Sequence, residues 1–568
     1  MDTIRKPTVW IGALVGGFLT TALTSLLFLA DQIAGLPFIP FDVFDYVSRL
    51  LPGPLLTFGI DMMVEMIIAL DMGETSAAAK TAEQVMGLGA FLVLGAVAIA
   101  LMYGLMNRSK TQARNLVPGL ALGLAFGAAM MLISTQVNLT ATASLPAQII
   151  WVVLAFALWG MAANWIYNDL AHSEGKTKTD EETGETVTVE PLNRRQFMVR
   201  IGGASAVLTI VGAGLGALVG RRPGEGSLVS SIPADAPTDG AGNVLPNAAD
   251  PMQTAPGTRP EYTPLDKHYR IDISSRPPVI DAVEWRLEVG GLVDNPVSLS
   301  LQDLHDKFER VDRFITLSCI SNRIGGTLIS TIKWSGFRMK DFLEYVKPQA
   351  GAVAMKITGA DNFDEYVMLD LVEADERVMF AYEWDDQPLK QKHGFPLRIF
   401  IPDRYGMKQP KWIKSIEFVD AWAEGYWVRR GWSKEAIVNT TSVVDTVSTD
   451  SILKDDAGYV VPVGGIAYAG AKMISKVEVS VNGGDWEEAQ LRQPLSELTW
   501  VIWRYDWRFQ EGEYRFEVRT YDADGLLQSL DSRGTRPDGA TGVHGKKANM
   551  PTLADLENPP EPETEAES

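Results

Sequence analysis

Phe314-Ile-Thr-Leu-Ser-Cys-Ile-Ser-Asn-Arg-Ile-Gly-Gly326 contains Cys319, the only cysteine in the 568 residues of this chain. A single thiol cannot form an intrachain disulfide, hold an iron–sulfur cluster or attach a c-type haem. It can be a catalytic nucleophile, a buried apolar residue, or one soft ligand to a metal that an organic cofactor carries. The surrounding chain has to distinguish among these three roles.

The first 220 residues are much more apolar than the rest of the chain. Five runs are long enough to span a bilayer: 8–30, 85–106, 116–137, 147–168 and 199–220. A sixth segment, 51–70, is ambiguous because it carries Asp61 and Glu65 one helical turn apart. Such a pair marks either a proton path or a polar seam at the membrane interface. We therefore expect residues 1–220 to form an α-helical membrane anchor of five or six helices.

The charges beside these runs predict which side of the membrane the remaining chain occupies. Positive clusters favour the cytoplasm, and they flank the runs at Arg5 and Lys6, at 108–114 and at 194–200. Placing the second and third clusters inside sends the run at 199–220 outward. Everything after about residue 221 is then expected outside the cytoplasm.

The segment before the last run predicts how the chain is exported. Asn193-Arg-Arg-Gln-Phe-Met-Val-Arg200 resembles a twin-arginine signal, since two arginines precede Phe and a mildly apolar stretch. No small-x-small cleavage site follows Val219, so we expect an uncleaved anchor. The alternative is a basic stop next to a membrane helix.

The chain beyond the anchor divides into four segments by composition. Residues 221–262 are rich in Pro, Gly, Ala and Asp and predict a flexible linker. Residues 263–436 mix helix-like and strand-like stretches, which predicts an α+β domain. Residues 437–530 hold short strands and Gly-containing turns, typical of an all-β immunoglobulin-like sandwich. The acidic segment 531–568 predicts a disordered tail, and the net charge of −20 argues against a nucleic-acid partner. The clearest single elements are a helix at 301–308 and strands at 285–289, 355–358, 397–401, 476–481 and 514–520.

Several ordered motifs carry a resemblance to a known family. Cys319-Ile-Ser-Asn-Arg323 resembles the cysteine loop of the sulfite oxidase family of molybdopterin enzymes. The match continues in order through Ala381–Leu389, His393–Arg398, Pro402–Gly406, Lys411-Trp412 and Glu424–Trp427. The resemblance covers roughly residues 265–530. It implies that 263–436 is a molybdopterin-binding catalytic domain and 437–530 the family's immunoglobulin-like domain, behind an anchor like that of membrane-anchored bacterial members.

The resemblance also assigns roles to single residues. It implies that Cys319 is the molybdenum ligand beside the dithiolene of one pyranopterin, a soft thiolate on a high-valent metal. Arg398 and Lys411 would supply the positive charge that the cofactor phosphate needs. The full set implied for cofactor binding is Asp266, Tyr269, Arg270, Cys319, Thr358, His393, Arg398, Gln409, Pro410 and Lys411. A surface-loop role competes for Asp266, Thr358 and Gln409, and a core thiol is the competing role for Cys319.

The catalytic candidates are Cys319, Arg270, Arg323 and Trp432, with structural salt bridging as the alternative for the two arginines. Two of the matched positions depart from sulfite oxidases proper. Those enzymes have an arginine where this chain has Ile324, and a tyrosine where Arg429-Arg-Gly-Trp432 places Trp432. Losing a charged donor and a phenol weakens an oxyanion pocket. The departure makes sulfite a doubtful substrate and favours a neutral oxide such as a sulfoxide.

We therefore expect a membrane-anchored, extracytoplasmic, molybdenum-dependent oxidoreductase that transfers an oxygen atom to or from a small substrate. The chain shows no motif for a haem or iron–sulfur relay, so its electron partner is expected to be separate, a cytochrome or a quinone-linked subunit. The family also implies a possible homodimer. Three alternatives stay open: a sulfoxide reductase-type enzyme acting on oxidised methionine, a non-enzymatic surface receptor that kept the fold, and a transporter gated by the outer domain.

Overall fold

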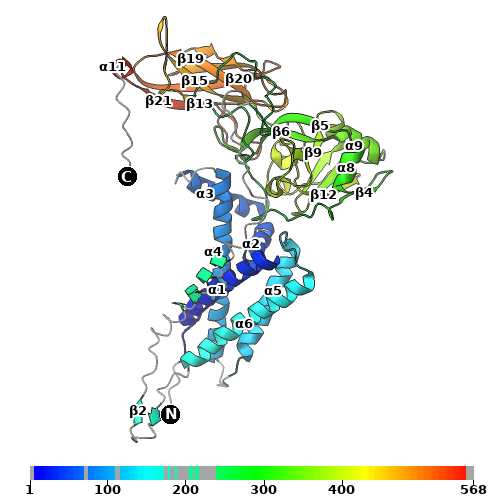
Figure 1. Ribbon diagram of the computed structural model, residues 1–568, viewed down its shortest axis with the longest axis vertical. Coiled ribbons are helices and arrows are strands. Elements are labelled where there is room, and N and C mark those ends of the chain that lie inside the picture. The colour runs from blue at the N-terminus through cyan, green and yellow to red at the C-terminus, as the bar shows by residue number, and fades with distance from the viewer. Residues whose placement is uncertain are drawn as a thin grey trace. The chain divides into compact units, whose positions relative to one another are not determined.

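The computed structural model describes residues 6–69, 75–108, 115–171 and 238–557, together with short pieces between 177 and 215. The chain forms two units, which are described separately (Figure 1). A helical unit comprises Met1–Met63, Ala78–Val229 and Ile273–Val279. A β-rich unit comprises Val64–Ala77, Ser230–Asp272 and Ile280–Ser568.

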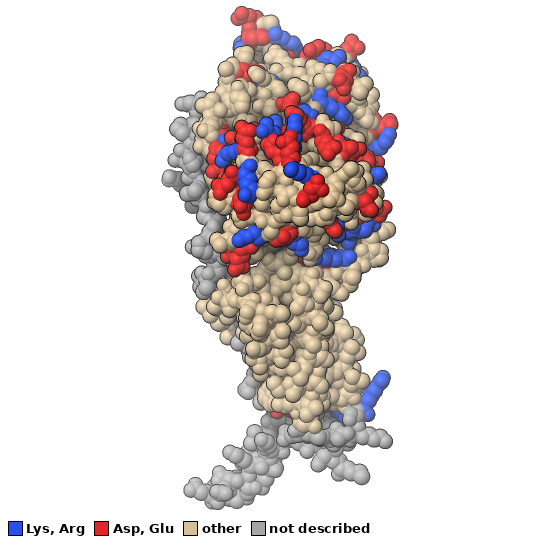
Figure 2. Space-filling view, turned by 90° about the vertical axis from the view of Figure 1, so that its right-hand side faces the viewer, with Lys and Arg blue, Asp and Glu red and all other residues tan. Residues whose placement is uncertain are grey.

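Four helices are long and apolar enough to cross a membrane: α1 (Val9–Ala34), α4 (Thr75–Arg108), α5 (Val117–Val137) and α6 (Leu145–Ala171). They confirm four of the five predicted runs. Side chains such as Leu105, Leu132 and Leu158 lie exposed on them, and on the face in Figure 2 the helical part is almost free of charged side chains. This surface is compatible with a lipid environment.

The predicted fifth and sixth helices have different outcomes. The ambiguous segment 51–70 forms α3 (Gly53–Ala69), after a short α2 (Ile39–Leu50), and α3 is not among the four long apolar helices. Half of the predicted helix at 199–220 is described, and it contains a shorter apolar helix, Ser205–Leu215. The arginine motif at 193–200 lies wholly outside the described residues. A small hairpin, β1 (Thr177–Thr179) and β2 (Thr186–Thr188), is described between α6 and the arginine motif in the sequence.

The segment Ile273–Val279 belongs to the helical unit, although the sequence places it within the catalytic domain. Arg276 Nη1 lies 2.8 Å from Asp31 Oδ2 of α1, and the backbone N–H of Ser275 donates to Asp45 of α2. Val279 N–H donates to Leu139 O. Polar and charged contacts therefore hold a segment that hydropathy alone assigns to the soluble part.

The catalytic region contains two sheets with a core between them. One sheet has the order β10-β9-β6-β5, with β11 on β9, and the other has the order β4-β3-β12-β7-β8. Leu287, Met355 and Ile416 of the second sheet pack in one core with Phe337 and Phe380 of the first. The strands are β3 (Leu287–Gly291), β4 (Val297–Leu299), β5 (Val311–Ser318), β6 (Ile329–Arg338), β7 (Ala354–Gly359), β8 (Asp364–Met368), β9 (Met379–Trp384), β10 (Gln387–Pro388), β11 (Arg398–Phe400) and β12 (Ile413–Val419).

Three short helices complete this region: α8 (Leu301–Lys307), α9 (Met339–Val346) and α10 (Leu369–Glu373). The predicted helix at 301–308 is confirmed, and its start has a local cause. The Ser300 hydroxyl accepts from Asp303 N–H while the Asp303 carboxylate accepts from Ser300 N–H, a capping box that satisfies two free backbone donors. The predicted strands at 285–289, 355–358 and 397–401 are also present, as β3, β7 and β11.

The C-terminal region is built from two antiparallel sheets around a shared core. Val461 and Trp503 of one sheet pack with Val479 and Phe516 of the other. The first sheet holds β13 (Thr441–Val447), β14 (Leu453–Asp455), β15 (Gly458–Tyr468), β18 (Gln490–Leu491) and β19 (Val501–Arg508). The second holds β16 (Ile474–Val481), β17 (Trp486–Glu488), β20 (Gly512–Asp522) and β21 (His544–Met550).

Two segments that composition predicts as unstructured are folded where the structure describes them. In the predicted linker, Leu245, Ala255 and Tyr262 are buried. In the predicted tail, β21 pairs with β20 over its whole length before a short α11 (Leu553–Glu557). Backbone pairing and scattered apolar contacts need neither a hydrophobic period nor a low charge, so composition missed both. Residues 558–568 lie outside the described part of the chain.

Candidate active site

The cysteine lies in the loop 319–328 that joins β5 to β6. Cys319 N–H donates to Leu328 O at 2.9 Å, and Asn322 N–H donates to Cys319 O at 3.0 Å. The Asn322 side chain closes the loop from inside, since its Oδ1 accepts from Leu328 N–H at 3.0 Å. The thiol therefore has a position that backbone hydrogen bonds define, at the end of a fully paired hairpin.

The Cys319 thiol is buried and lies 3.0 Å from Ser321 Oγ. Burial raises the pKa of the Cys319 thiol, and the Ser321 hydroxyl and the Lys411 charge oppose this only in part. A buried, protonated thiol is a poor nucleophile in water. It becomes a ligand once a metal cation replaces its proton.

Two cations, the buried Arg398 and the mostly buried Lys411, lie near this thiol. The Arg398 guanidinium on β11 donates to His393 O at 3.1 Å and stands 4.6 Å from the centroid of the Trp334 ring. Burial lowers the pKa of Arg398 to about 10. Lys411 Nζ lies 3.1 Å from Ile271 O and 3.2 Å from Asp272 Oδ2, and burial lowers the pKa of Lys411 to about 8. Desolvation disfavours both charges in the protein as it stands.

Two imidazoles stand beside these cations. The His268 ring is 5.0 Å from the His393 ring, and His268 Nδ1 shares a hydrogen bond with Ser330 Oγ. Burial, and behind it the charges of Arg398 and Lys411, lowers the pKa of His268 well below its usual value, and burial does the same for His393. Both rings are therefore neutral at physiological pH.

Several polar atoms among these residues and their neighbours are buried without a partner among the described residues. They are His393 Nε2, Trp334 Nε1 and Trp384 Nε1. Trp384 lies 4.8 Å from the His393 ring and 5.7 Å from the His268 ring. Orphaned buried donors are rare because each costs free energy, about 1–3 kcal/mol. Beside Arg398 and Lys411, these groups offer donors and positive charge that would suit an anionic, hydrogen-bonding group.

The residues present fit a phosphate-bearing molybdenum cofactor. Cations and N–H donors suit its phosphate and pterin, and the buried thiol suits its metal. Gly394 adds a close backbone approach: it has φ +114°, and a Cβ there would lie 3.3 Å from the Cβ atoms of Arg398 and Lys411. A bulkier residue at this position would crowd both cationic side chains.

The structure brings together most of the predicted cofactor residues. Tyr269 is buried in one apolar cluster with Cys319, and burial raises the pKa of its phenol. Arg270 binds Asp272 at 2.7 Å, and Asp272 in turn contacts Lys411.

The remaining four residues have other positions. Gln409 holds the backbone, donating from Nε2 to Arg404 O at 2.7 Å, and Pro410 O accepts from Ile399 N–H. Thr358 lies on β7 beside Gly359. A Cβ added at Gly359 would lie 2.7 Å from Lys411 O. Asp266 is exposed.

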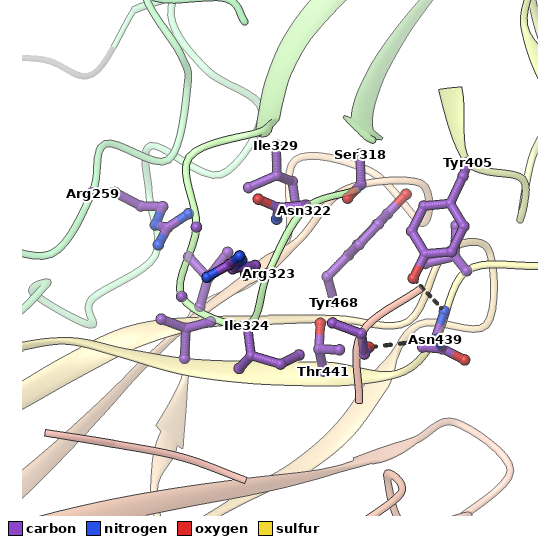
Figure 3. Close-up of a pocket in the computed structure, with 16 residues that line it drawn as sticks. Arg259, Ser318, Asn322, Arg323, Ile324, Ile329, Tyr405, Asn439, Thr441 and Tyr468 are labelled. Carbon is purple, nitrogen blue, oxygen red and sulfur yellow. Dashed lines mark hydrogen bonds between the residues drawn. The ribbon is translucent and has the colours of Figure 1, made fainter. Parts of the chain in front are cut away.

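The candidate substrate side is apolar with cations at its edge. Trp432 is buried in one cluster with Ile320 of the cysteine loop, and Ile324 packs against that cluster. The Arg536 guanidinium lies 5.3 Å from the centroid of the Trp432 ring. Arg323 is half exposed and lines a pocket beside Ile324, with Tyr405 and Tyr468 on its other side (Figure 3).

Comparisons with known proteins now identify the family. The family profile described as "Oxidoreductase molybdopterin binding domain" matches residues 274–427. The uncharacterized oxidoreductase YuiH of Bacillus subtilis is 33% identical over 154 residues, which cover 74% of that protein and 27% of this chain. The chain belongs to the sulfite oxidase family of molybdopterin-dependent oxidoreductases.

Longer relatives in this family match about the same region. Mouse mitochondrial sulfite oxidase is 28% identical over 275 residues, covering 40% of this chain and 50% of that protein. A nitrate reductase of Fusarium oxysporum is 25% identical over 260 residues, covering 38% of this chain and 29% of that protein. The chain thus spans half or less of the length of these relatives. The crystal structure of the sulfane dehydrogenase SoxCD from Paracoccus pantotrophus gives a TM-score of 0.45 at 16% identity, covering 59% of this chain and 96% of that one.

The cluster around His393 includes residues that the sequence did not single out. His268 precedes Tyr269 directly, and Trp384 lies inside the matched motif 381–389, so both had a local signal. Trp334 and Ser330 lie on β6 outside the quoted motifs and reach the pocket only through strand pairing. Arg536 comes from the segment predicted as a tail, where no local pattern indicates a role.

Proposed function

We propose that this chain is a membrane-anchored molybdenum enzyme that moves an oxygen atom to or from a small substrate. The observation that carries the proposal is the cluster of polar groups around the buried Cys319 thiol: the cations Arg398 and Lys411, whose pKa values burial lowers, and the unpartnered His393 Nε2. When bound, a molybdenum–molybdopterin cofactor supplies two-electron oxygen-atom transfer chemistry. Cys319 would bind its metal, and Arg398 and Lys411 its phosphate.

The remaining polar groups would orient this cofactor rather than exchange protons with it. His268 and His393 are neutral at physiological pH because burial lowers the pKa of each. A neutral imidazole offers one donor and one acceptor, which suits a hydrogen bond to a pterin or phosphate. Asp272 links Lys411 to Arg270, so it would place the Arg270 side chain relative to the phosphate.

The wider organisation is part of the same proposal. Four long apolar helices are compatible with a membrane anchor, and the basic clusters of the sequence favour a catalytic domain on the extracytoplasmic side. The chain would carry an uncleaved twin-arginine signal, a molybdopterin domain at 263–436 and an immunoglobulin-like domain at 437–530. Electrons would pass to or from a separate cytochrome or quinone-linked subunit, and a homodimer is possible.

A specific observation favours one substrate class. Ile324 and Trp432 stand where sulfite oxidases proper carry a cation and a phenol, and Trp432 lies in an apolar cluster with the cysteine loop. An apolar wall discriminates poorly against a neutral group but disfavours a desolvated anion. A neutral S-oxide, including oxidised methionine, is therefore the favoured substrate class, and sulfite is the less favoured one.

The test combines metal analysis with a substrate screen. The full chain is purified in detergent from a host that makes the molybdenum cofactor, and from a matched host that does not. We expect molybdenum and turnover only in the first preparation, assayed with a dye acceptor for sulfite and a dye donor for S- and N-oxides. A chain without molybdenum from the competent host would refute the enzyme and leave the non-enzymatic receptor as the better account.

A further inference from the structure

Two adjacent carboxylates on β8 hold two different segments of the active site. β8 is the edge strand of its sheet, and neighbouring side chains on a strand point to opposite faces. Glu365 points inward and is fully buried, whereas Asp364 is partly exposed. We name the residues 406–411 the cofactor turn and the residues 424–432 the tryptophan segment.

Glu365 holds the cofactor turn through a buried ion pair. Lys408 Nζ lies 2.8 Å from Glu365 Oε1, and the two side chains are 7% and 0% exposed. The backbone N–H of Tyr366 donates to the same oxygen at 3.0 Å. Lys408 ends the 3-10 turn η2 (Gly406–Lys408), three residues before Lys411. The pair therefore fixes the position of Lys408, from which the backbone continues to Lys411.

The start of the cofactor turn touches the other side of the same pocket. A Cβ on Gly406 would lie 3.4 Å from Tyr269 Oη and 3.5 Å from Ser318 O. Ser318 is the residue before Cys319. A displacement of the turn would thus act on both the Lys411 side and the thiol side of the cofactor position.

Asp364 holds the tryptophan segment instead. Its carboxylate accepts two hydrogen bonds from the Arg429 guanidinium, at 2.6 and 2.8 Å, and its backbone O accepts from Tyr426 N–H at 2.9 Å. Three residues after Arg429 comes Trp432, the side chain beside the cysteine loop. Gly425 at the start of this segment lies against Glu365, since a Cβ there would be 2.7 Å from both carboxylate oxygens.

We propose that Glu365 and Asp364 are positioning residues that set the two halves of the site separately: Glu365 the cofactor turn, and Asp364 the tryptophan segment. The inference rests on the proposed function. The two pairs differ in energy, because removing one partner of a buried ion pair leaves a desolvated charge, whereas a partly exposed pair contributes little. Glu365 should therefore govern retention of the cofactor, and Asp364 the fit of the substrate.

The test compares Glu365→Gln with Asp364→Asn in the full-length protein. Gln keeps the shape that Gly425 packs against but leaves Lys408 without a counter-charge. We expect Glu365→Gln to release the cofactor about tenfold faster or more. We expect Asp364→Asn to keep its molybdenum content and kcat while KM for the substrate rises about two- to fivefold. Glu417→Gln, an exposed carboxylate on β12 of the same sheet, is the control that should change neither.

A second measurement does not depend on the cofactor. Backbone hydrogen exchange in cofactor-free protein should speed up in 406–411 for Glu365→Gln and in 424–432 for Asp364→Asn. A wild-type chain without molybdenum would refute the proposed function, yet this exchange pattern would still report on the two carboxylates. Equal effects of both variants on the same segment, or no effect on either, would overturn the positioning roles.

A double variant covers the case in which Glu365→Gln fails to fold. Glu365→Leu with Lys408→Met removes both charges, and such apolar replacement of a buried pair is often neutral or stabilising. We expect this protein to keep a wild-type Tm but to release its cofactor faster, because only packing then holds the cofactor turn. Wild-type release at a wild-type Tm would assign the pair a purely structural role and overturn the proposal.

Discussion

Lys411→Met should remove a pH dependence of stability that only the cofactor-free protein shows. Burial lowers the pKa of Lys411 from 10.5 to about 8. Between these values the folded protein loses a proton that the unfolded chain still binds, so stability rises with pH. One pKa unit corresponds to about 1.4 kcal/mol, so the full gain is about 3 kcal/mol, most of it reached by about pH 10.

The assay is thermal unfolding of the full-length protein in detergent, followed by tryptophan fluorescence from about pH 7 to about pH 10. At about 2–4 °C per kcal/mol, the wild type should gain on the order of 5–10 °C relative to Lys411→Met over this range. The buried thiol acts in the opposite direction, because burial raises the pKa of Cys319. The Lys411 charge opposes that rise, so its removal leaves the Cys319 pKa higher and adds to the difference between the two proteins.

Two controls make the outcome decisive. Lys390→Met removes an exposed lysine near the same pocket and should follow the wild type at every pH. Cofactor-loaded wild type should lack the slope, because a bound phosphate anion favours the charged lysine. If the Tm values of cofactor-free wild type and Lys411→Met change equally across the whole pH range, burial does not lower the pKa of Lys411. The argument that these residues fit a phosphate would then fail.

Three further outcomes are expected. Cys319→Ser should lower turnover by at least about 100-fold, equivalent to about 2.7 kcal/mol of barrier, while the pterin, measured by fluorescence after oxidation, stays bound; full activity would contradict the role of the thiol as metal ligand. Ile324→Arg should lower KM for sulfite by about tenfold through a charge-assisted hydrogen bond to the anion, and steady-state kinetics showing no gain for sulfite over a neutral sulfoxide would place position 324 outside the substrate pocket. Replacing Arg194 and Arg195 together by Lys should leave the catalytic domain accessible only from the cytoplasm in a protease-protection assay, and unchanged exposure on the outer side would exclude export through the twin-arginine motif.

The structure bears out those parts of the fold for which neighbouring residues supply the signal. The helix at 301–308 begins at a capping box, and α1, α4, α5 and α6 follow from uninterrupted apolar runs. The predictions differ from the structure where partners come from far along the chain. β21, in the predicted tail, forms because β20 offers it a free edge, and Tyr262, in the predicted linker, is buried against Phe314.

The site divides in the same way. Cys319, Arg398 and Lys411 stand in ordered motifs, and family membership could be expected from those residues alone. The charge state of the groups around the cysteine could not be expected from the sequence. Asp272 meets Lys411 across 139 residues, and Ser330 meets His268 across 62.

The sequence by itself determined the family, the class of cofactor that the motifs imply, four of the apolar helices and five of the strands. Only the tertiary structure decided that Lys411 and Arg398 are desolvated, that His268, Trp334 and Trp384 join the pocket, and that β8 holds two of its segments. The physical reason is that hydropathy, turns and caps depend on residues adjacent in the chain. Desolvation and unmet hydrogen bonds depend instead on which distant strands and loops meet in space.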